Sequence, residues 1–205
     1  MLMLYINGCS WTNSHTFRDA LLSNDILVIN NAASGNSNFQ ICKQTKYDLK
    51  NFSKHFEKIT AIIFLTEAFR SKYEYTMVKG LGSLQDLASK SLHQMKKAID
   101  SSLPDNVNII YSSSFVDLPW ETNFPSMLTL ACKAHGIIQE QTQCYTTKAN
   151  EVQKVFELKP NLKDLDVIIN RLSTIEKIPN QHNHHLKDYI SYTAVVKQIQ
   201  EVLNV

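Results

Sequence analysis

The chain has 205 residues, of which 43% are hydrophobic and 20% charged, and its formal net charge is +2. This balance predicts a single globular domain over residues 1–205. The small charge excludes a strongly basic protein, and the lysines are spread along the sequence, so no nucleic-acid partner is expected. No run of about 18 apolar residues occurs, which excludes a membrane span. No signal peptide is recognisable at the start, so the expected location is cytoplasmic.

The first half of the sequence alternates short apolar runs with amphipathic segments. In chain order, we expect a strand at 2–6, a helix at 15–22, a strand at 26–29, a helix at 38–52, a strand at 61–65, a helix at 83–102 and a strand at 107–111. The signals are weaker from 112 to 146. The helices expected after residue 111 are 125–135, 148–158, 162–175 and 187–203.

Continuous apolar strands that alternate with helices are typical of a parallel sheet buried on both faces. The expected fold is therefore α/β, with a three-layer, flavodoxin-like parallel sheet and helices on both faces. Ligands bind to such sheets beyond the carboxyl ends of the strands. Four polar segments are expected to share that edge: residues 7–12, 31–38, 65–70 and 182–186.

Ser10 is the candidate nucleophile in the first of these segments. It directly follows the first strand, where its hydroxyl and its own N–H can both face the site. Gly35 lies in the second segment, where it allows the backbone to approach a ligand closely. Its N–H is therefore a candidate donor to an oxyanion.

In this order, the four segments resemble the conserved blocks of the SGNH (GDSL-type) hydrolase family. The family's Gly-Asp-Ser motif is matched by Gly8, Cys9 and Ser10, with cysteine in place of aspartate. The run GCSWT, followed by ASGNSN, is similar to a branch common in phage and bacterial genomes. Gly35 matches the glycine of the family's second block. The asparagine of the third block has no counterpart in residues 65–68.

The family's last block, Asp-x-x-His, falls on the histidine-rich segment. If its histidine is His185, then His182 occupies the place of the aspartate; if it is His184, Gln181 does. The resemblance implies that His185 removes the proton of the nucleophile, which then attacks an ester carbonyl. His182 cannot act as the carboxylate that normally orients such a base, so backbone carbonyls are the expected substitute.

The resemblance also implies oxyanion or substrate contacts around the second and third segments. The candidates are Asn38, Thr66, Glu67 and Arg70. Arg70 would bind an anionic group of the substrate. The alternative for Glu67 and Arg70, which are three residues apart, is an ion pair that serves the structure alone.

Three other interpretations stay open at this point. The histidines His182, His184 and His185 would form a solvated loop, or bind a metal, although no cysteine or carboxylate completes such a set and no metal is expected. Cys9 would be a thiol nucleophile, against the more usual role of a small buried residue. A nucleotide-binding protein is a third interpretation, but neither GxGxxG nor GxxxxGK[ST] occurs, and no cofactor is expected.

Two functions follow from the sequence. The first is a serine esterase that cleaves an ester on a carbohydrate or lipid, with a small-molecule or glycan ester as its substrate. The second is a non-catalytic relative, phage-encoded and virion-associated, that binds a virion partner or another copy of itself. The intact Gly8 and Ser10 pattern favours the first, and the degenerate third and fourth blocks favour the second.

Overall fold

The computed structural model describes residues 2–21, 26–66, 68, 84–115, 118–137 and 188–203. The strands among these residues are β1 (Leu2–Asn7), β2 (Leu27–Asn30), β3 (Lys58–Leu65) and β4 (Val107–Ser113). The helices are α1 (His15–Leu21), α2 (Asn38–Phe52), α4 (Leu84–Asp100), α5 (Met127–Ala134) and α8 (Tyr189–Leu203).

The four strands form one parallel sheet in the order β2-β1-β3-β4. This order equals the first four strands of a flavodoxin-like sheet, in which the chain changes direction across the sheet between β1 and β3. The crevice at that switch point, beyond the carboxyl ends of β1 and β3, is where ligands bind in such folds. The expected α/β fold with a parallel sheet is therefore confirmed.

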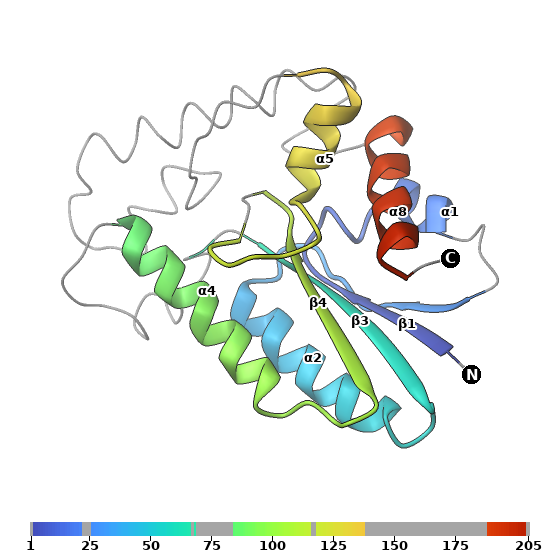
Figure 1. Ribbon diagram of the computed structural model, residues 1–205, viewed down its shortest axis with the longest axis vertical. Helices are drawn as coiled ribbons and strands as arrows, with labels where there is room; N and C mark the ends of the chain where they lie inside the picture. The colour runs from blue at the N-terminus through green and yellow to red at the C-terminus, as the bar shows by residue number, and fades with distance from the viewer. Residues whose placement is uncertain are drawn as a thin grey trace.

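Alternate residues of the strands face two separate helical layers (Figure 1). Leu4 and Ile6 of β1 pack with α1, α5 and α8, and Met3 and Tyr5 pack with α2 and α4. These four side chains of the central strand are almost completely buried. Burial on both faces explains why the strands are continuous apolar runs in the sequence.

The observed elements differ from the expected ones mainly at their ends. β3 begins at Lys58 rather than at residue 61, because Ile59 pairs with both β1 and β4. α5 begins at Met127, since the Ser126 hydroxyl accepts the N–H of Thr129 and caps the helix. The expected helices at 148–158 and 162–175 lie outside the described residues.

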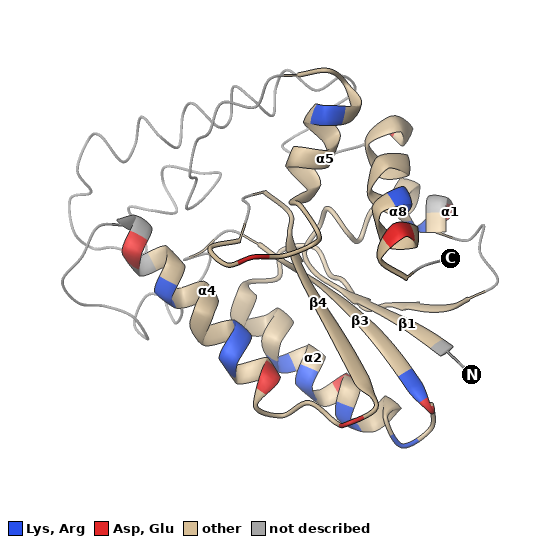
Figure 2. Ribbon diagram, viewed as in Figure 1, with Lys and Arg blue, Asp and Glu red and all other residues tan. Residues whose placement is uncertain are grey.

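Charged side chains of the described residues gather along α2, α4 and the adjoining turns, with both signs interspersed (Figure 2). The helices on the other face of the sheet carry fewer charges (Figure 2). None of the helices in the described part of the chain is long and apolar enough to cross a membrane.

Candidate active site

The end of β1 is held tightly against α2 and β3. The Asn7 side chain donates to the Thr45 hydroxyl at 3.0 Å, and its carbonyl oxygen accepts the N–H of Gly8 at 2.8 Å. A Cβ atom added to Gly8 would lie 3.2 Å from the Phe64 carbonyl oxygen and would overlap the Thr12 hydroxyl. Gly8 is therefore required by the close approach of the chain to β3.

Ser10 begins a single helical turn two residues after this glycine. The turn is closed by a hydrogen bond from the Asn13 N–H to the Cys9 carbonyl at 3.2 Å. Trp11 and Thr12 are fully buried, Ser10 is buried with 9% of its surface exposed, and Asn13 is half-buried. Residues three apart in a helical turn lie on the same side, so Ser10 and Asn13 share the outer side of this turn.

The neighbours of Ser10 fix the turn in the core. The Cys9 thiol is fully buried and lies 3.1 Å from the Ser114 hydroxyl. The Trp11 ring packs 4.6 Å from the Phe115 ring, centroid to centroid, and the Trp11 carbonyl accepts the Tyr192 hydroxyl at 2.9 Å. Cys9 thus takes the place of a small buried residue, where its thiol has no access to a substrate.

The loop after β2 lies beside the Ser10 turn, as the sequence predicts for two segments at one edge. The Asn31 N–H donates to the Ile6 carbonyl at 2.9 Å, and the Ala33 N–H donates to the Gly8 carbonyl at 3.3 Å. Gly35 is exposed in this loop with a φ angle of +84°, and an added Cβ would meet nothing within 4 Å. Gly35 is therefore favoured by its backbone conformation rather than by packing.

Asn38 joins this loop to the end of β3. Its amide nitrogen donates to the Thr66 carbonyl at 3.2 Å, and its amide oxygen accepts the Thr66 N–H at 2.8 Å. Asn38 and Thr66 are both buried. The side chain of Asn38 thus positions two neighbouring loops, and the substrate contacts expected for both residues stay predictions.

The remaining predicted site residues lie outside the described part of the chain. They are Glu67, Arg70, His182, His184 and His185. The three described segments that meet at the edge are therefore those of Ser10, Gly35 and Thr66. The contribution of the histidine-rich segment stays a prediction.

Sequence reasoning missed Asp48, a buried carboxylate beneath this edge. It accepts the Tyr5 hydroxyl at 2.7 Å, the Asn31 amide at 2.8 Å and the Gln44 amide at 2.7 Å. Asn31 begins the loop that carries Gly35, so Asp48 anchors that loop to α2. The signal was present, because Asp48 lies three residues after buried Thr45 on the apolar side of the helix.

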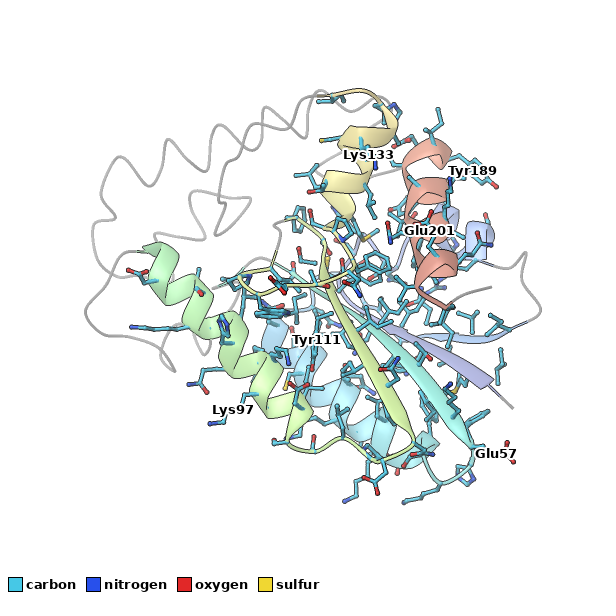
Figure 3. The ribbon with its side chains drawn as sticks, in the orientation of Figure 1. Glu57, Lys97, Tyr111, Lys133, Tyr189 and Glu201 are labelled. Atoms are coloured by element: carbon cyan, nitrogen blue, oxygen red, sulfur yellow. The ribbon has the colours of Figure 1, made fainter. Side chains whose placement is uncertain are left out.

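A second missed pair joins the ends of α5 and α8. The His135 Nε2 lies 2.8 Å from Asp188 Oδ1, which also accepts the N–H of Ser191 at 2.7 Å. Lys133 and Tyr189 mark the same end of these two helices in Figure 3. Asp188 thus caps α8 and joins it to α5, with both side chains of the pair largely buried.

The described residues hold no group of three or more His, Cys, Asp and Glu side chains arranged to bind a metal ion. The described cysteines Cys9, Cys42 and Cys132 are buried, and none of them forms a disulfide bond with another described cysteine.

No protein-family model and no curated protein matches the sequence. Among solved structures, the chain is similar to the lipase/acylhydrolase from Enterococcus faecalis, with 12% identity and a TM-score of 0.44 over 99% of this chain and 95% of that one. Protein YXIM of Bacillus subtilis is 13% identical, with a TM-score of 0.48 over 98% of this chain and 56% of that one.

A member of the lipolytic G-D-S-L family from Veillonella parvula is 11% identical, with a TM-score of 0.35 over 89% of this chain and 100% of that one. Likenesses of this strength do not establish a family for the chain.

Proposed function

We propose that this protein is a serine hydrolase that cleaves esters, with Ser10 as its nucleophile. The observation that carries the proposal is the position of Ser10 at the carboxyl end of β1, at the switch point of the sheet and beside the Gly35 loop. Ligands of parallel α/β sheets bind at this point. Among the described residues, no hydrogen-bond partner occupies the Ser10 hydroxyl.

Backbone N–H groups on two sides of Ser10 support oxyanion binding. The first N–H groups of a helical turn have no partner within that turn, and the N–H of Ser10 belongs to this set. The exposed loop at Gly35 contributes the second donor. A tetrahedral oxyanion formed on attack by Ser10 would lie between them, which is the arrangement that stabilises acyl transfer.

The proposed base is His185, with His182 or backbone carbonyls as its support. The start of α8 supports this assignment, because Tyr192 in its first turns bonds the Trp11 carbonyl, next to Ser10. His185 precedes Asp188, at the start of α8, by three residues. Because three residues of extended chain span at most about 11 Å, His185 is tethered to the start of this helix. We further propose that the ester belongs to a carbohydrate or lipid.

Hydrolysis of 4-nitrophenyl acetate tests the proposal. The Ser10→Ala variant is expected to lose more than about 1000-fold in kcat/KM, because the nucleophile is gone. Ser101→Ala is the control, since Ser101 is an exposed serine after α4, at the opposite edge of the sheet, and should keep full activity. Equal activity of wild type and Ser10→Ala would contradict the proposal.

A non-catalytic binding protein is the alternative. The missing asparagine of the third block favours it, because the corresponding position, Glu67, supplies no amide donor to an oxyanion. Absence of turnover by a folded wild-type protein, on short-chain and long-chain esters alike, would favour this alternative.

A further inference from the structure

The outer side of the Ser10 turn continues into a polar rim. Asn13 shares that side with Ser10, and Cβ atoms three residues apart in a helical turn are about 5–6 Å apart. The Asn13 amide oxygen accepts a hydrogen bond from the Arg18 guanidinium of α1, and its nitrogen lies 3.4 Å from the Ser34 hydroxyl. The rim, defined as Asn13, Arg18, Ser34 and Asn36, thus links α1 to the loop of Gly35.

The loop side of the rim is fixed to the same turn. The Asn36 side chain donates to the Gly8 carbonyl at 3.3 Å, two residues before Ser10. The Ala33 N–H donates to the same carbonyl. Asn36 and Asn13 therefore hold the two sides of the rim at fixed positions relative to Ser10.

Arg18 supplies the positive charge of the rim. It is exposed, and no carboxylate of the described residues forms an ion pair with it. A guanidinium has five N–H donors, and the bond to Asn13 is the one that Arg18 makes with its side chain to a described residue. The remaining donors are suited to a carboxylate or phosphate, which guanidinium groups bind in a bidentate manner.

We infer that Arg18 binds an anionic group of the substrate, so that this site prefers esters with a carboxylate or phosphate a few bonds from the scissile carbonyl. The Asn13 amide oxygen holds the guanidinium beside the turn that carries Ser10. This inference rests on the proposed function, which supplies the reacting ester, and adds to it the chemical class of the substrate.

Two matched esters test the preference. The mono-4-nitrophenyl ester of adipic acid carries a terminal carboxylate, and 4-nitrophenyl hexanoate carries a methyl group at the corresponding end. Wild type is expected to favour the adipate ester in kcat/KM. Arg18→Gln is expected to reduce that preference about tenfold, since one charge-assisted bond is lost. Arg18→Lys should restore part of the preference.

Lys97→Gln is the matched control. Lys97 is exposed on α4, on the other face of the sheet, and projects away from the strands (Figure 3). This variant loses the same charge without touching the rim, so its preference should equal that of wild type. Equal loss of preference in Arg18→Gln and Lys97→Gln, or no loss in Arg18→Gln, would overturn the inference.

A binding measurement separates this inference from the proposed function. In the Ser10→Ala background, monomethyl adipate is expected to bind more tightly than methyl hexanoate in calorimetry, and addition of Arg18→Gln should remove the difference. Such binding without any turnover in wild type would contradict the proposed function and support the anion site. If wild type hydrolyses both 4-nitrophenyl esters, but neither kcat/KM nor calorimetric binding distinguishes the carboxylate-bearing ester from the neutral one, the anion site alone would be contradicted.

Discussion

Gly35 and Gly136 are a matched pair of residues, one inside the proposed site and one outside it. Their φ angles are 84° and 64°, and a Cβ added to either would meet nothing within 4 Å. Both are therefore glycines because of backbone conformation, as residues at positive φ usually are. Comparing alanine variants at the two positions separates the loss of stability caused by a positive φ angle from any effect on catalysis.

We predict that Gly35→Ala and Gly136→Ala each lower the free energy of unfolding by about 1 kcal/mol, because alanine is strained at positive φ. Only Gly35→Ala is expected to lower kcat/KM, by roughly tenfold or more, since a small displacement of an oxyanion donor is costly. Urea denaturation and ester hydrolysis check the two effects. Equal hydrolysis rates in the two variants would argue against an oxyanion role for the Gly35 loop.

At the residue scale, the places of Ser10 and Gly35 after β1 and β2 could be predicted from short motifs, and their roles in catalysis stay predictions. Asn13 and Arg18 could not be predicted, since their contact depends on how α1 packs beside the Ser10 turn. The place of Asp48 on the apolar side of its helix could be predicted, but its role could not, because two of its three donors, Tyr5 and Asn31, lie on other segments of the chain.

At the element scale, the start of α8 depends on one carboxylate. The sequence predicts a helix from residue 187, whereas α8 begins at Tyr189. Asp188 explains the difference, because its Oδ1 accepts the N–H of Ser191 as an N-cap residue does. The same atom bonds His135 at the end of α5, a contact between distant segments that periodicity does not reveal.

We predict that Asp188→Ala lowers the free energy of unfolding by roughly 2–3 kcal/mol, since it removes the cap and leaves buried His135 without its partner. Asp188→Asn should cost about 1 kcal/mol or less, because an asparagine oxygen can still accept the N–H of Ser191. Urea denaturation measures both values. Equal losses of unfolding free energy in the two variants would mean that the side-chain oxygen shared by aspartate and asparagine does not stabilise the start of α8.

At the scale of the whole molecule, the layered α/β architecture could be predicted because fully buried parallel strands leave continuous apolar runs. The strand order could not be predicted, because the apolar sequences of β1 to β4 do not indicate which strands lie side by side. A single domain over residues 1–205 stays a prediction, since several expected helices lie outside the described residues. The clearest whole-molecule consequence of the packing is a pair of tyrosine–carboxylate hydrogen bonds, from the buried Tyr5 to Asp48 and from the buried Tyr111 to the partly exposed Asp100, both at 2.7 Å.

These bonds predict a loss of stability at alkaline pH. Burial, then hydrogen bonds to Asp48 and Asp100, raise the pKa of Tyr5 and of Tyr111 well above the usual value of about 10. Below that pH both the folded and unfolded states keep the protons. As the pH rises further, the unfolded state loses them first, so the free energy of unfolding falls by up to about 1.4 kcal/mol per pH unit for each tyrosine.

Urea denaturation between pH 9 and 11.5 tests this consequence with Tyr111→Phe as the comparison. The variant has one fewer raised pKa, so its unfolding free energy should decline less steeply than that of wild type. The difference in slope is expected to approach about 1.4 kcal/mol per pH unit. Parallel declines in the two proteins would refute a raised pKa at Tyr111.

The reactivity of Ser10 is tested most directly by treating the folded protein with a fluorophosphonate and locating the adduct by peptide mass spectrometry. One adduct is expected, on the hydroxyl of Ser10, and it should disappear in Ser10→Ala and persist in Ser101→Ala. An unmodified protein, or an adduct on any other residue, would contradict it.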